Sequence, residues 1–405
     1  MNQERDALLA QVAAYMYSQH TLSQVEIAQR LKLTQPKVSK LIKTAIDQNW
    51  LIDRRPSFNS ALFPPDRLEE IKSHCYAHWD QLVAGLTPWQ SALPSIRDIT
   101  VIHTGRPGKE GRDYDMRLRK LGHAAAERVV ELFPRMHRVG ICWGKTIYHL
   151  SERIGQIDIA KSVPKAGGSR HRKARSGTPI RFIPVTGDSL TNPDAVISAS
   201  NLVAMLHRAI GAQGEPTSLG PVAACYPKRF SGAHGEVLHE FFECVPGYRD
   251  VFGTRDAASH RGVPLINQVD TLILGIGPAT RETNDPWLDD TILAAEISRE
   301  TLEKISYGNI SGYFIPRPRL SASDQKCIDG INERWTGIRE EHIAACAARS
   351  RQTGAPGVFV LAVGAAKAEI VRVCAHRSLI NELIIDEELA DALAIHPDAK
   401  SSQKP

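Results

Sequence analysis

The sequence lacks the features of a membrane protein or a secreted protein. Among its 405 residues, no apolar run reaches the roughly 20 residues that a membrane-spanning helix needs. The opening residues, MNQERDALLA, lack the apolar stretch of a secretory signal. We therefore expect a cytoplasmic protein that makes no contact with a membrane.

Cysteine is scarce and scattered. The seven cysteines include no C-x-x-C pair, and their number is odd, which argues against a disulfide framework and against a structural zinc site. The sequence also lacks a Walker loop, a dinucleotide-binding fingerprint and a nucleophile elbow. We expect no metal site and no cofactor. The net charge of +5 is too small to indicate nucleic-acid binding by itself.

The length accommodates two domains, one of them small. We expect a DNA-binding domain in residues 1–56 and a linker with a helix in residues 57–97. A larger domain in residues 98–395 and a disordered tail in residues 396–405 complete this division. Prolines 56, 64 and 65 mark the connecting stretch.

Three helices are predicted in the small domain. Apolar residues at helical spacing within residues 8–16 predict the first helix. The second begins at Ser23, whose hydroxyl can form a capping box with Glu26. Thr34 is a favourable N-cap for the third helix, and Pro36 lies in its first turn, where the missing N–H has no cost.

This layout is that of a helix-turn-helix, either simple or winged. Ala28 is small enough for two helices to cross, and Leu33 fills the turn. Lys32 stands where glycine is usual, so we expect a left-handed backbone there. No acid occurs between Ile27 and Ile46, whereas five Lys or Arg residues do. A basic face of this kind suits a helix in the major groove, although a helical hairpin with a solvated lysine face is the alternative.

Contacts with double-stranded DNA are expected from the second and third helices. We predict that Gln35, Ser39 and Lys40 contact bases and that Lys37 and Lys43 contact phosphates. The full set of predicted DNA-binding residues is Ser23, Gln24, Thr34, Gln35, Pro36, Lys37, Ser39, Lys40 and Lys43.

In the larger domain, short apolar runs alternate with helical patterns. Strands alternating with helices predict the α/β class, with a mostly parallel, Rossmann-like sheet. Ligands of such sheets bind where the strands end. Glycine-bearing loops follow four of the predicted strands, and a fifth such segment lies at residues 308–312. Their amides, helix N-termini and lysines suit a phosphorylated small molecule. The predicted effector-binding residues are Gly144, Lys145, Thr146, Gly187, Asp188, Gly277, Asn309, Gly364 and Lys367.

The sequence resembles the SorC (sorbitol operon regulator) family of bacterial sugar-responsive repressors and activators over nearly its whole length. The segments that carry the resemblance are LSQVEIA (22–28), VSKL (38–41), VGICWGKT (139–146), VDTLILGIG (269–277), GNISG (308–312), GAAK (364–367) and LIIDEELA (383–390). The chain differs from the family pattern at Asn309, where Asp is usual, and at Ala365 or Ala366, where a second glycine is expected.

The resemblance implies a larger domain with the fold of glucosamine-phosphate deaminases and ribose-phosphate isomerases, used to sense a phosphorylated sugar. It also implies dimers or tetramers on palindromic operators. The chain would then be a transcriptional regulator, repressor or activator, and not an enzyme.

A sugar-phosphate isomerase or deaminase with an accessory helical domain is the alternative. An enzyme needs a positioned acid and base, and the candidate acids are Asp188, Asp270, Asp386 and Glu387. Of these, Asp386 opens a predicted helix and resembles an N-cap. The basic run in residues 161–175 is interpreted as a solvated loop, because glycines interrupt it.

Overall fold

The computed structural model describes residues 2–19, 23–52, 57–58, 62–64, 67, 93, 95–105, 114–157, 180–189, 195–253, 263–280 and 286–394. The chain divides into two compact units, one of residues 1–87 and 103–105, the other of residues 88–102 and 106–405. The predicted helix in the linker, the basic run at 161–175 and the predicted tail lie outside the described residues. None of the helices described has both the length and the apolar character of a membrane span.

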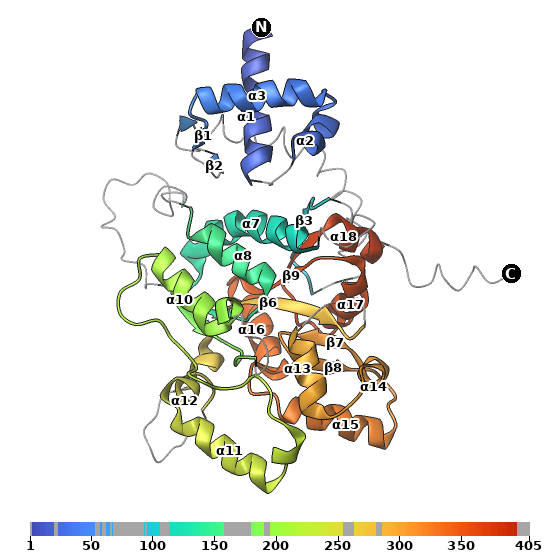
Figure 1. Ribbon diagram of the computed structural model, residues 1–405. Coiled ribbons are helices and arrows are strands. Elements are labelled where there is room, and N and C mark those ends of the chain that lie inside the picture. Colours follow the sequence, from blue (N-terminus) through green and yellow to red (C-terminus); the bar gives the residue numbers. More distant parts are fainter. Residues whose placement is uncertain are drawn as a thin grey trace, which may run out of the picture. The chain divides into compact units, whose positions relative to one another are not determined.

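The smaller unit is a three-helix domain followed by a hairpin (Figure 1). Its elements are α1 (Asn2–Gln19), α2 (Gln24–Leu31), α3 (Gln35–Asp47), β1 (Leu51–Ile52) and β2 (Ser57–Phe58). The two strands pair antiparallel. Of the two forms that the sequence allowed, simple and winged, the domain therefore has the winged form. Apolar side chains from all three helices share one core.

Local signals in the sequence set the ends of α2. The amide of Glu26 donates to Ser23 Oγ at 3.3 Å, and the amide of Ser23 donates to Glu26 Oε2 at 2.7 Å. The helix ends at Lys32 in the left-handed conformation, with φ of 52°. The predicted capping box and the predicted left-handed turn are therefore confirmed. Thr34 precedes α3 as predicted, but its side chain makes no cap hydrogen bond there.

The larger unit confirms the predicted α/β class. Its helices and strands are β3 (Asp98–Ile102), α7 (Tyr114–Leu132), β4 (Arg138–Ile141), α8 (Lys145–Ile154), β5 (Arg181–Pro184), α10 (Ala199–Ala209), α11 (Ala233–Cys244), α12 (Pro246–Phe252), β6 (Thr271–Pro278), α13 (Pro286–Ala295), α14 (Arg299–Ile305), β7 (Ser306–Ile310), β8 (Tyr313–Pro316), α15 (Ala322–Glu333), α16 (Glu340–Thr353), β9 (Gly357–Ala362), α17 (Ala368–His376), β10 (Glu382–Asp386) and α18 (Glu387–Ala394). In Figure 1, α7, α8 and α17 lie around the strands, whereas α11 and α12 lie below them.

Six parallel strands form the main sheet, in the order β3-β10-β9-β6-β4-β5. Every residue of β9 and β10 is buried, as expected for strands with helices on both faces. The carboxyl end of β6 pairs antiparallel with β7, and β7 with β8. Ser311 and Gly312 form the tip of that hairpin with φ of 52° and 93°, the signature of a type I′ turn.

The crossovers reverse direction in the middle of the sheet. The chain moves from β3 to β4 and from β4 to β5 toward one edge, but from β6 to β9 and from β9 to β10 toward the other. Because parallel crossovers are right-handed, α8 and α17 pack on opposite faces. The reversal lies between β4 and β6, and ligands of open α/β sheets bind at the carboxyl end of such a point.

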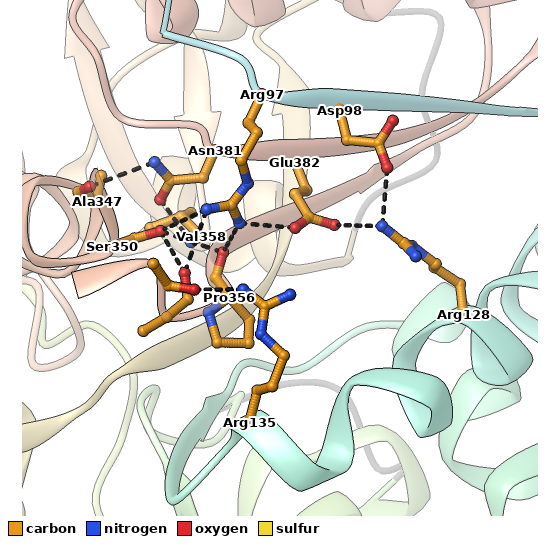
Figure 2. A network of polar contacts seen from close by, with 12 residues as sticks. Arg97, Asp98, Arg128, Arg135, Ala347, Ser350, Pro356, Val358, Asn381 and Glu382 are labelled. Carbon is orange, nitrogen blue, oxygen red and sulfur yellow. Dashed lines mark hydrogen bonds and ion pairs between the residues drawn. The ribbon is translucent and has the colours of Figure 1, made fainter. Parts of the chain in front are cut away.

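The amino edge of the sheet is closed by a polar network (Figure 2). Arg97 donates to Glu382 Oε1 and to the carbonyl of Pro356, both at 2.7 Å. Asn381 accepts from the amide of Val358 at 2.8 Å and donates to the carbonyl of Ala347 at 3.2 Å. These contacts tie the starts of three strands together and leave the carboxyl edge as the place for a ligand.

Candidate functional site

The exposed face of α3 carries the predicted DNA contacts. Val38, Leu41, Ile42 and Ala45 are buried on the opposite face. The predicted contacts on and before this helix are all exposed: Thr34, Gln35, Pro36, Lys37, Ser39, Lys40 and Lys43. The helix therefore presents three lysines to solvent, and its first turn contains no acidic residue.

The start of α2 is linked to this face. Gln35 Nε2 donates to Gln24 Oε1 at 3.1 Å, which joins α2 and α3 across the turn. Ser23 is exposed, and its side chain is already engaged in the capping box. The arrangement can place one helix against base edges while the start of α2 lies near the phosphates.

Two glycine loops lie on either side of β6 at the carboxyl edge of the sheet. Gly144 follows β4 and Gly364 follows β9, and both strands pair with β6. Their φ angles are 130° and 97°, a region that side chains other than glycine rarely adopt. Among the described residues, nothing beyond the chain neighbours lies within 4 Å of the position that a Cβ would take at either glycine. Both glycines thus leave open space on the side where a side chain would stand.

Each of these loops opens a helix. Gly144 is the N-cap of α8, and Gly364 is the N-cap of the short 3₁₀ turn Ala365–Lys367 that continues into α17. Because the N-cap residue is glycine in both cases, no N-cap side chain competes for the first free amides. Two uncapped helix N-termini facing the same edge are a favourable environment for an anion.

Lys367 adds a positive charge to the second loop. Its side chain belongs to a residue only 9% exposed, and within the described part of the chain its ammonium group makes no hydrogen bond or ion pair. Because its ammonium nitrogen still reaches solvent, this charge is accessible to an incoming ligand. Of the two predicted site lysines, Lys367 is therefore the one whose charge has no partner among the described residues.

Asp386 at the end of β10 holds the second loop in place. Its Oδ1 accepts from the amide of Gly364 at 3.0 Å and from the amide of Leu389 at 3.1 Å, and Arg117 donates to its Oδ2. The second of these bonds is the N-cap of α18 that the sequence predicted. Burial raises the pKa of the Asp386 carboxyl, and these hydrogen bonds and Arg117 act against that rise.

The loop after β5 places polar groups beside this edge. The hydroxyl of Thr186 and one carboxylate oxygen of Asp188 are buried, and neither has a hydrogen-bond partner among the described residues. Burial raises the pKa of Asp188, while a hydrogen bond with Ser198 lowers it. Both groups are available for a ligand that carries hydroxyls. Packing explains the glycine at position 187, because a Cβ there would lie 2.6 Å from the carbonyl oxygen of Val222.

Other predicted residues already have partners. Lys145 is exposed and forms an ion pair with Asp115 at 2.9 Å. Asn309 Oδ1 accepts from the amide of Gly312 at 3.0 Å and so braces the β7–β8 turn. Gly277 pairs with Asn309 between β6 and β7. The structure explains these residues without a ligand, and their part in effector binding stays a prediction, as does that of Thr146 beside Lys145.

Cys142, two residues before Gly144, is not activated as a nucleophile. Burial raises the pKa of its thiol to about 11, and its sulfur accepts from the amide of Gly275 at 3.1 Å. Because the thiolate is the reactive form, this thiol is inert at neutral pH.

A histidine cluster that the sequence analysis missed lies between α7 and α8. His123 comes from α7, and His149 and Glu152 come from α8; their ligand atoms lie within 4.8 Å of one another. Burial, with Arg119 and Arg153 nearby, lowers the pKa of His123 to about 4. The one signal in the sequence was the spacing of His149 and Glu152, three residues apart on one helical face.

Solved structures of similar fold include two regulators. The full-length sorbitol operon regulator SorC from Klebsiella pneumoniae is 15% identical, with a TM-score of 0.50 over 96% of this chain and 99% of that one. A transcriptional regulator from Streptococcus pneumoniae TIGR4 is 16% identical, with a TM-score of 0.50 over 78% of this chain and 98% of that one. No protein-family model and no curated protein matches the sequence. The chain therefore has the fold of these two regulator structures.

Proposed function

We propose that the protein is a bacterial transcriptional regulator of the SorC type, whose binding to operator DNA is controlled by a phosphorylated sugar or a related metabolite. One observation carries the proposal: a winged helix-turn-helix with an exposed basic helix occurs in the same chain as two uncapped, glycine-led helix N-termini at the switch point of a parallel sheet. The SorC protein of similar fold is itself named an operon regulator.

The proposed effector contacts follow from the carboxyl edge. Amides after Gly144 and Gly364 would receive phosphate oxygens, with Lys367 as the charged partner. Thr186 and Asp188 would receive sugar hydroxyls. A ligand that binds one conformation of the protein more tightly shifts the equilibrium between conformations, and the affinity for DNA changes with it.

The enzyme alternative is weakened by the surroundings of its candidate acids. Asp270 lies before β6, at the amino edge, where it accepts from the amide of Arg138 at 2.8 Å. Asp386 is held by backbone amides and Arg117. Asp188 and Glu387 remain as candidates, so the alternative predicts turnover of sugar phosphates that an Asp188→Asn or a Glu387→Gln variant loses.

The test has two steps. First, duplexes selected from a random pool with the full-length chain should converge on one sequence with two half-sites, about one helical turn or a multiple apart. Second, sugar phosphates should change the affinity for that duplex in fluorescence anisotropy, whereas the same sugars without phosphate should not. Failure to enrich any sequence, or equal effects of both sugar sets, would contradict the proposal.

We also propose that the chain forms a homodimer or a homotetramer, because two half-sites need two helix-turn-helix domains. Multi-angle light scattering should give at least twice the 44.7 kDa chain mass. A stable monomer at micromolar concentration would contradict this part.

A further inference from the structure

The histidine cluster between α7 and α8 lies apart from the residues of the proposed function. His123 is 6% exposed, and His149 and Glu152 are half-buried one and two turns into α8. Buried ionisable side chains normally have hydrogen-bond partners. Among the described residues, neither His123 Nε2 nor His149 Nδ1 has one.

The cluster exists because α7 and α8 approach closely at Gly122. A Cβ at this position would lie 2.6 Å from the carbonyl oxygen of Thr146 and 2.8 Å from the Cβ of His149. Glycine therefore lets the two helices come together at this point. His123, the next residue of α7, is thereby brought beside the face of α8 that carries His149 and Glu152.

The distances suit metal ligands better than hydrogen bonds. Glu152 Oε2 lies 3.6 Å from His123 Nε2 and 3.5 Å from His149 Nδ1, beyond the roughly 2.7–3.2 Å of a hydrogen bond. Two ligands bonded to a tetrahedral zinc ion at about 2.0–2.1 Å lie roughly 3.3 Å apart. The two distances from Glu152 are thus close to this spacing, and the ligand atoms of the two histidines lie within 4.8 Å of each other.

We propose that His123, His149 and Glu152 bind one divalent first-row transition-metal ion of the Zn²⁺ class. Two imidazole nitrogens and one carboxylate oxygen are a ligand set that zinc uses, with a fourth position for water. Arg119 and Arg153 are cations that act on His123, and Glu152 supplies a negative charge that offsets them. Arg153 is itself shielded by Glu127, 3.7 Å away.

The experiment uses the full-length, tag-free chain after treatment with a chelator. Isothermal titration with Zn²⁺ should give one site per chain, and Co²⁺ should give the visible absorption bands of tetrahedral cobalt without a sulfur-to-cobalt charge-transfer band. His149→Ala and Glu152→Gln should each weaken Zn²⁺ binding about tenfold or more, since even the loss of an outer-shell partner weakens metal binding by about 10–100-fold.

Two controls make the result decisive. His137→Ala removes an exposed histidine outside the cluster and should leave the affinity unchanged. Glu152→Gln keeps the shape of the side chain, and circular dichroism should show a wild-type fold. Unchanged Zn²⁺ affinity in the folded Glu152→Gln and His149→Ala variants would overturn the proposal. Binding of well below one equivalent, or a cobalt spectrum that shows thiolate ligation, would also overturn it.

Discussion

Replacement of Lys367 by methionine tests the proposed effector site most directly. The ammonium group of this 9%-exposed residue has no partner among the described residues. Methionine fills a volume similar to that of lysine and removes the charge. A charge-assisted hydrogen bond contributes about 1.5–3 kcal/mol, which is roughly 10–100-fold in affinity. Lys367→Met should therefore weaken a phosphate-bearing effector by that factor.

The same change should leave the stability of the unliganded protein nearly unchanged. The ammonium nitrogen of Lys367 reaches solvent, so its removal relieves no burial cost. The unfolding free energy of the unliganded variant, measured with urea, should therefore stay close to that of the wild type. A loss of affinity can then be ascribed to the missing charge.

Lys145→Ala is the matched control. Lys145 also follows a glycine at the carboxyl edge, but it is exposed and paired with Asp115, and exposed pairs contribute about 0–1 kcal/mol. Calorimetric titration should show a large loss of affinity for Lys367→Met and little for Lys145→Ala. Equal affinity of wild type and Lys367→Met for the same sugar phosphate would refute the assignment. Equal losses in both variants would indicate a diffuse charge effect instead.

Three further predictions concern the two units separately. Lys43→Ala should weaken binding to all duplexes alike and lower the salt slope by about one, whereas Gln35→Ala should relax specificity by about 1–3 kcal/mol; anisotropy that shows neither change would disprove the placement of α3. Ser23→Ala should lower the unfolding free energy of the helix-turn-helix by about 0.5–2 kcal/mol through loss of the cap, and an unchanged urea midpoint would count against it. Burial raises the pKa of Asp188 above 3.8, so the folded state binds this proton more tightly than the unfolded state does. The unfolding free energy should therefore fall as the pH rises from 3.8 through the raised pKa. Asp188→Asn should flatten this part of the pH profile, and an identical profile would contradict it.

Local patterns in the sequence predicted the small unit well. The capping box at Ser23 and the left-handed turn at Lys32 depend on residues a few positions apart, and the structure has both. The choice between a simple and a winged form could not be made, because β1 and β2 are only two residues each and their pairing leaves little pattern in the sequence.

The candidate site was predicted less completely, because strand order depends on distant residues. Lys145 and Lys367 both follow glycine loops, and only the structure distinguishes the paired lysine from the buried one. The close approach of Val222 gives Gly187 a packing explanation that the sequence could not reveal, and its part in effector binding stays a prediction. The cluster of His123 with His149 was missed, because the approach of α7 and α8 brings together residues that are remote in the sequence.

Because the crossovers reverse direction, a ligand at the carboxyl edge would contact both layers of helices in the large unit. The first turn of α8 and the turn that leads into α17 belong to helices on opposite faces of the sheet, joined through β4, β6 and β9. A phosphate bound by both turns would link the helix on one face of the sheet to the helix on the other face. Transient opening of either helix would then require release of the ligand first. The backbone amide hydrogens at the starts of α8 and α17 should therefore exchange with deuterated water more slowly as the ligand concentration rises. Although the two helix starts are remote in sequence, both exchange rates should fall by the same factor.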